Sequence, residues 1–139
     1  MQLGLGVSWR PELALWIDRY PKLGFVALMV EHFPASRPLP QALKRLQDRG
    51  VQMIPHGLSL SLGSARPPEP ARLAAIEQLA HRTQAPLVSE HLAFVRARDL
   101  ESGHLLPLER TPEGLQVVLE NLALAQASLS RPLYLENIS

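Results

Sequence analysis

Three side chains that can bind metal ions follow or end short apolar runs of the chain. His56 follows the apolar run 51–55, His91 follows the run 86–89, and Glu136 ends the run 133–136. Two neutral imidazoles and a carboxylate are a common ligand set for iron, manganese or zinc. A histidine at the end of a strand is also often an ordinary hydrogen-bonded loop residue, so each of these residues taken alone has a structural interpretation. Three together favour a metal site if the runs are neighbouring strands.

The elements around these residues alternate between short apolar runs and longer amphipathic stretches. This spacing predicts β-α-β units and therefore a parallel sheet. No Gly-x-Gly-x-x-Gly follows the first run, since Gly4-Leu5-Gly6 lies inside it, so a dinucleotide-binding fold lacks its main signature. We expect strands at 3–8, 24–31, 51–55, 86–89 and 133–136, helices at 11–20, 40–49, 70–82 and 111–129, and a turn or hairpin at 96–104.

The predicted fold class is α/β, a TIM-type (β/α)-barrel that is incomplete, with about five parallel strands and its helices on the outside. We treat residues 1–139 as a single partial domain. Such a barrel places its chemistry at the C-terminal ends of its strands, which is where His56, His91 and Glu136 fall. A closed barrel needs eight strands and about 250 residues. The unclosed sheet predicts either a longer or split protein, or a second copy that covers the open edge.

Composition narrows the functional classes. The chain has 139 residues, 46% of them hydrophobic, and a formal net charge of +1, which argues against a general nucleic-acid-binding protein. The absence of cysteine excludes a disulfide scaffold, a thiolate nucleophile and an iron–sulfur cluster. The longest apolar run, 25–30, is too short to cross a membrane, and the N-terminus does not resemble a signal peptide, so we expect a cytoplasmic protein.

Two further segments carry polar groups at the same predicted rim. The stretch 56–64 is rich in Gly and Ser, and residues such as Ser59 let a ligand approach the backbone and offer it donors. It lacks the lysine of a phosphate-binding loop, and a structural loop anchored by its leucines is an equal alternative. Glu31 and His32 end the second predicted strand. We expect them near the ions or in the wall of the pocket, although an ordinary surface role fits His32 better.

Four motifs resemble the DUF692 family. They are His56-Gly57-Leu58-Ser59-Leu60-Ser61-Leu62-Gly63, Ser89-Glu90-His91-Leu92, the segment 105–113 with Leu-Leu-Pro-Leu and Thr-Pro-Glu, and Leu135-Glu136-Asn137. They occur in the family's order and at matching spacing, over nearly the whole chain. Family members are about twice as long, so the chain resembles their N-terminal half.

The resemblance implies a TIM-type barrel that holds two or three iron ions and uses dioxygen to modify cysteines of ribosomally made peptides, usually with a partner protein that presents the peptide. It places His56, His91 and Glu136 at ligand positions, with Glu136 suited to bridging two ions. Glu90 would support a ligand, and Asn137 would line the substrate pocket. The family's remaining ligands come from its C-terminal half, and its usual Glu-Asn after the second strand is Glu31-His32 here.

Two other interpretations stay open from the sequence. One is a half-barrel that has no catalysis of its own and is completed by self-association or by a partner chain. The other is a metal-dependent isomerase or endonuclease similar to xylose isomerase, for which Arg66 and Arg96 are the candidate phosphate- or sugar-binding residues.

Overall fold

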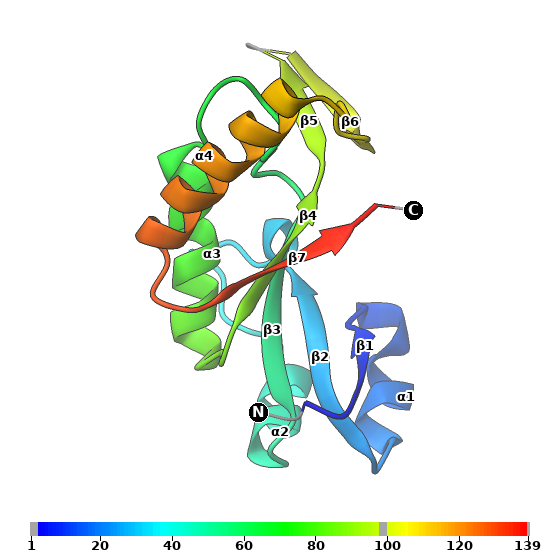
Figure 1. Ribbon diagram of the computed structural model, residues 1–139. Coiled ribbons are helices and arrows are strands. Elements are labelled where there is room, and N and C mark those ends of the chain that lie inside the picture. The colour runs from blue at the N-terminus through cyan, green and yellow to red at the C-terminus, as the bar shows by residue number, and fades with distance from the viewer. Residues whose placement is uncertain (1–2, 98–99, 139) are drawn as a thin grey trace.

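The computed structural model describes residues 3–97 and 100–138. Its main sheet is entirely parallel, and the order of the strands in space follows their order along the chain, as in successive units of a (β/α)-barrel (Figure 1). The sheet curls but does not close, which confirms the predicted incomplete barrel. The five strands are β1 (Leu5–Ser8), β2 (Leu23–Met29), β3 (Gln52–Gly57), β4 (Val88–Leu92) and β7 (Leu133–Asn137).

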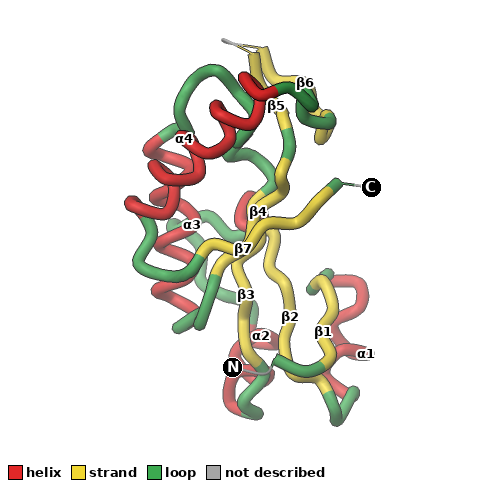
Figure 2. Tube along the Cα trace, viewed as in Figure 1, coloured by secondary structure: helices red, strands yellow, loops and turns green. Residues whose placement is uncertain are grey.

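The connections between the strands are helical, and Figure 2 shows the helices flanking the strands. Thr111 caps the last helix as predicted, because its Oγ1 accepts a hydrogen bond from the backbone N–H of Gly114 at 3.0 Å. The helical elements are α1 (Ala14–Arg19), α2 (Gln41–Asp48), α3 (Pro70–Thr83) and α4 (Pro112–Ser128), with the short 3-10 helices η1 (Pro11–Leu13) and η2 (Val30–His32).

Successive side chains along each strand point alternately to the two faces of the sheet. Val26, Leu28, Met53 and Val88 point to the outer face and are fully buried with the leucines of the helices. The residues between them in sequence point to the inner face, which is the inside of the incomplete barrel. The hydrophobic core therefore lies between sheet and helices, and the inner face is left for a cavity.

Several predicted boundaries differ from the structure. The second strand ends at Met29, because the chain then turns into η2, so Glu31 and His32 belong to a 3-10 helix. The strands β3 and β4 extend further than predicted, since Gly57 and Glu90 still pair across them, and His56 and His91 therefore lie inside strands. The predicted helix 11–20 begins as η1 and only then becomes α1.

The predicted insert 96–104 is a hairpin, made of β5 (Phe94–Ala97) and β6 (Leu100–Leu106), which pair antiparallel. Residues 98 and 99 of this insert lie outside the described residues. The hairpin follows β4 directly and projects beyond the C-terminal end of the sheet (Figures 1 and 2).

Both edges of the sheet carry exposed apolar side chains. In the described part of the chain, β1 and β7 each pair with one neighbour. Trp16 is 77% exposed beside the β1 edge, and Tyr134 is 58% exposed on β7. In a closed barrel of this kind, both edges would be paired. Among the described residues, no helix is long and apolar enough to span a bilayer.

Candidate metal centre

His56, His91 and Glu136 meet on the inner face of the sheet, at the C-terminal ends of β3, β4 and β7. His91 and Glu136 are direct partners across β4 and β7, and His56 pairs with Ser89, two residues before His91. One candidate ligand atom from each of the three residues lies within 4.8 Å of the other two. Glu136 Oε2 lies 3.6 Å from Nε2 of His56, and Glu136 Oε1 lies 3.8 Å from Nε2 of His91. That these residues bind a metal remains a prediction.

Hydrogen bonds set which nitrogen of each imidazole faces the cluster. His91 Nδ1 lies 3.2 Å from the carbonyl oxygen of Gly57, and because a carbonyl only accepts, Nδ1 carries the proton. His56 Nδ1 lies 2.8 Å from Ser89 Oγ, and that hydroxyl has the carbonyl of Pro55 at 3.5 Å as its own acceptor. The same tautomer follows for both rings, with the Nε2 lone pairs directed at Glu136. Such outer hydrogen bonds are typical of metal-binding histidines.

Burial and a neighbouring histidine favour the neutral form of the His56 imidazole. Burial lowers the pKa of His56, the neighbouring His91 lowers it further, and the carboxylates of Glu136 and Glu31 oppose the shift. The two rings are in edge contact, with centroids 4.6 Å apart. A neutral imidazole is the form that binds metal ions. The histidine side chains are only 13% and 12% exposed, whereas that of Glu136 is 59% exposed, so the cluster opens to solvent on the Glu136 side.

The cluster forms one wall of a cavity of about 460 Å³ inside the incomplete barrel. The opposite wall comes from β1 and β2, and much of the lining between the two walls is apolar. The lining residues are Ser8, Arg10, Phe25, Ala27, Met29, Ile54, His56, Leu58, Ser89, His91, Leu105 and Glu136. The shape and lining suit an organic substrate that reaches a metal ion at one end.

Glu31 and Ser59, both expected to support the ligands or line the substrate pocket, bind each other. Glu31 Oε1 accepts hydrogen bonds from Ser59 Oγ at 2.8 Å and from the backbone N–H of Leu58 at 3.0 Å. They hold the loop that leaves β3 just after His56. His32 is exposed in η2 and does not line the cavity, so the structure places it apart from the cluster.

Glu90 lies on the opposite face of the sheet from the cluster, although it directly precedes His91. Its carboxylate accepts from the backbone N–H of His91 at 2.8 Å and of Leu60 at 3.2 Å. Burial raises the pKa of Glu90 to about 7, against the opposing effect of these hydrogen bonds. Gly57 makes room for this group, because a Cβ at position 57 would overlap Glu90 Oε2. Gly57 was missed as a supporting residue, although its place directly after His56 was a visible signal.

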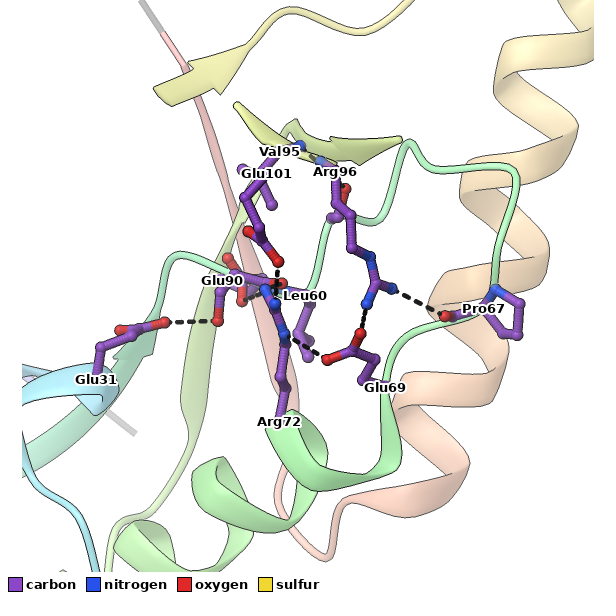
Figure 3. A network of polar contacts seen from close by, with 11 residues as sticks. Glu31, Leu60, Pro67, Glu69, Arg72, Glu90, Val95, Arg96 and Glu101 are labelled. Carbon is purple, nitrogen blue, oxygen red and sulfur yellow. Dashed lines mark hydrogen bonds and ion pairs between the residues drawn. The ribbon is translucent and has the colours of Figure 1, made fainter. Parts of the chain in front are cut away.

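An ion-pair network behind the loop ties it to α3 and to the hairpin (Figure 3). Arg72 donates to the carbonyl of Ser59 at 2.6 Å, pairs with Glu69 at 2.8 Å and also pairs with Glu101 of β6. Arg96 is buried and pairs with Glu69. Neither Arg66 nor Arg96 lines the cavity that holds the histidines.

Asn137, expected in the substrate pocket, lines a different cleft. Its side chain and that of Leu92 point to the outer face, where a space of about 760 Å³ lies between the end of the sheet and the N-terminal end of α4. Residues 107–112 form the other wall of this cleft. The cleft and the cavity of the cluster thus lie on opposite sides of the same strand ends.

Comparison with known proteins identifies the family of the chain. Residues 4–139 match the family model described as the RiPP precursor modification enzyme MbnB/TglH/ChrH, which covers the cluster and its supporting loop. The chain belongs to this family. The resemblance to DUF692 proteins that the four motifs indicated is confirmed.

Curated relatives show how much of a family member the chain represents. It is 46% identical over 144 residues to a UPF0276 protein of Streptomyces avermitilis, which covers 99% of this chain and 29% of the relative. It is 38% identical to a UPF0276 protein of Rhizorhabdus wittichii and 36% identical to one of Caulobacter vibrioides, in each case over 98% of this chain and 49% of the relative. The chain therefore spans about half the length, or less, of these relatives.

Proposed function

We propose that the chain is the N-terminal half of a cytoplasmic, iron-dependent enzyme that oxidatively modifies cysteine residues of a ribosomally made precursor peptide. The observation that carries the proposal is the convergence of His56, His91 and Glu136 on one point of the inner face. Membership of a family of precursor-modifying enzymes supports the peptide substrate.

The donor set fits a non-haem metal ion. Both Nε2 atoms face the carboxylate, both Nδ1 protons are held by other groups, and the two oxygens of Glu136 face different histidines. His56 and His91 would hold iron through nitrogen, and Glu136 would hold it through a carboxylate oxygen. Bound iron would supply the redox chemistry with dioxygen that side chains lack. The protein's part is to orient these ligands and to offer the substrate an apolar cavity beside them.

An ion held by three protein ligands would keep open coordination positions for the substrate and for ligands from another part of the protein or from a partner. The exposed carboxylate of Glu136 marks the open side, from which a peptide thiol would approach. We further propose that a partner protein presents the peptide there, as the family resemblance implies.

The open sheet supports completion by a second half-barrel, which would add the missing strands and further ligands. The strand edges of β1 and β7 are unpaired in the described part of the chain, and the relatives are at least twice as long. A covalently continuous second half, a separate chain or a second copy would each cover the flanks at Trp16 and Tyr134. A half-barrel that pairs in this way and has no catalysis of its own is the alternative, and the test below distinguishes the two.

The test is metal content per protomer, measured on each peak of a sizing column after loading with Fe(II) without oxygen. We expect at least one iron per protomer in the unmodified chain, and its loss in His56→Ala and in Glu136→Ala. His104→Ala is the matched control, because His104 lies on the hairpin and does not line the cavity. Metal retained in both cluster variants would contradict the proposal. An iron-free oligomer would favour the half-barrel without catalysis.

The two cations expected for the isomerase or endonuclease alternative, Arg66 and Arg96, do not line the cavity of the cluster. Arg96 is buried in the ion pair with Glu69. Cations that recognise a sugar phosphate or a DNA backbone must face the substrate.

A further inference from the structure

Arg10 stands across the cavity from the metal-binding cluster and at the same height. Ser8 of β1 pairs with Ala27 of β2, and two residues further along β2 Met29 pairs with His56 of β3. The ladder continues past β1, since the backbone N–H of Trp9 donates to the carbonyl of Ala27 at 2.9 Å. The next residue, Arg10, has extended backbone angles. This register places Arg10 level with His56, two strands away.

The backbone that carries Arg10 is firmly held. The indole of Trp9 is 8% exposed and packs against Phe33, with ring centroids 5.7 Å apart. Pro11 follows Arg10 directly and restricts the chain where η1 begins. The guanidinium is therefore presented from a rigid base.

Within the described residues, no carboxylate pairs with Arg10. The acidic groups that bind arginines elsewhere are committed, with Asp18 bound to Arg45 and Arg49, and Glu69 bound to Arg72 and Arg96. Among the described residues that line the cavity, Arg10 is the one permanent cation. Helix capping does not explain an arginine at position 10 either. Arg10 is the residue before η1, where Ser, Thr, Asp or Asn is preferred, and its side chain makes no capping hydrogen bond.

We propose that Arg10 binds a carboxylate of the peptide substrate while a second substrate group reaches the cluster. The idea rests on the proposed function only in taking the ligand to be a peptide. A guanidinium binds a carboxylate through two parallel hydrogen bonds, which fixes direction as well as affinity. The apolar lining between the two ends, including Phe25, Ala27 and Ile54, contacts the intervening part of the ligand.

The geometry sets the spacing of the two substrate groups. Two strand separations put the backbone of Arg10 about 10 Å from that of His56. An extended peptide rises about 3.3 Å per residue, so this span corresponds to about three residues. The preferred substrate therefore carries Asp, Glu or its terminal carboxylate two to three positions from the cysteine.

The probes are end-capped octapeptides with one Cys and one Glu, with the Glu moved from one to five positions away, and matched peptides with Gln or Lys in its place. Their dissociation constants for the chain are measured by calorimetry without oxygen, in the presence and absence of Zn(II). We expect the Glu peptide with two or three positions of spacing to bind about three- to tenfold tighter than its Gln counterpart, as an accessible Arg–carboxylate pair would give.

Variants separate Arg10 from general charge effects. Arg10→Gln should abolish the difference between Glu and Gln peptides, and Arg10→Glu should reverse it in favour of Lys. Arg19→Glu is the control, because it makes the same charge change on α1, away from the cavity lining, and should keep the preference for Glu. The proposal would be overturned if Arg10→Gln kept the preference for Glu over Gln peptides. It would also be overturned if the unmodified chain bound the two kinds of peptide equally well. Iron content of Arg10→Gln reports separately on the metal centre and should be unchanged.

Discussion

The carboxylate of Glu90 occupies the space that a side chain at position 57 would need. Gly57 and Glu90 are partners across β3 and β4, and a Cβ built on Gly57 would overlap Glu90 Oε2. The buried carboxylate binds the backbone of His91 on one side and of Leu60 on the other. It thereby connects the strand that carries one histidine with the loop that follows the other. The His-Gly pair of the first motif thus combines a candidate ligand with the space for a supporting group.

Gly57→Ala should destabilise the fold, because the methyl group displaces the carboxylate and leaves buried N–H groups without acceptors. We expect a loss of about 1–3 kcal/mol in the free energy of unfolding, measured by urea denaturation. In the double variant Gly57→Ala with Glu90→Ala, the loss of unfolding free energy should be much smaller than the sum of the losses in the two single variants, since both substitutions remove the same contacts. Additive costs would show that the overlap with Glu90 is not the cause.

Ser89→Ala should weaken metal binding without abolishing it. The hydroxyl of Ser89 holds Nδ1 of His56, and loss of such a partner typically costs about 10- to 100-fold in metal affinity. Zn(II) titration against a competing chelator measures the change, and Ser89→Thr should retain most of the affinity. The nitrogen chemical shifts of His56 in the metal-free protein should show the Nδ1–H tautomer in the unmodified chain and a mixture in Ser89→Ala. Unchanged shifts and unchanged affinity would remove Ser89 from this role.

Glu31→Gln should loosen the loop that leaves β3. The carboxylate accepts from both Leu58 N–H and Ser59 Oγ, and the amide side chain is a weaker acceptor. We expect faster hydrogen exchange at the amide of Leu58, with little change at amides within α3. Glu113→Gln on α4 serves as the control for removal of a negative charge. Equal exchange at Leu58 in the Glu31 variant and in the unmodified chain would contradict an anchoring role.

The stability of the chain should fall in acid partly through Glu77. Hydrogen bonds from Ser130 lower the pKa of Glu77 below its usual value of 4.5. A carboxyl group whose pKa is lower in the folded state stabilises the fold above the unfolded pKa, and this contribution is lost as the pH falls through the folded value. Because Glu77 is only partly buried and water screens its charge, the effect should be less than about 1 kcal/mol.

Thermal unfolding between pH 3 and pH 7 checks this prediction. Glu77→Gln should lower the melting temperature at pH 7, and this difference should shrink as the pH falls, because protonation removes the charge that Ser130 stabilises. Glu109→Gln, at the start of the segment before α4, is the control. A destabilisation by Glu77→Gln that is equally large at both pH values would mean that charge is not involved.

The alternation of elements and the three candidate ligands were accessible from the sequence alone. Short apolar runs separated by amphipathic stretches permit few arrangements other than a parallel sheet, and parallel strands bring their C-terminal ends to one rim. His56, His91 and Glu136 come at or near those ends, so their nearness follows from local pattern and topology. The helix start at Thr111 was equally accessible, because a cap depends on residues three positions apart.

Tertiary structure decided which neighbours of these residues share their cavity. Glu90 and Asn137 are each adjacent in sequence to a candidate ligand, yet they point to the outer face, because consecutive strand residues alternate in direction. The end of β2 at Met29 takes His32 away from the cluster, and the η2 turn that follows places the carboxylate of Glu31 where it accepts from the backbone N–H of Leu58. Arg10 enters the cavity only because the curl of the sheet turns β1 toward β3 and β4. A linear pattern records spacing along one chain, whereas curl and packing set distances between strands, and those distances determine what a site can bind.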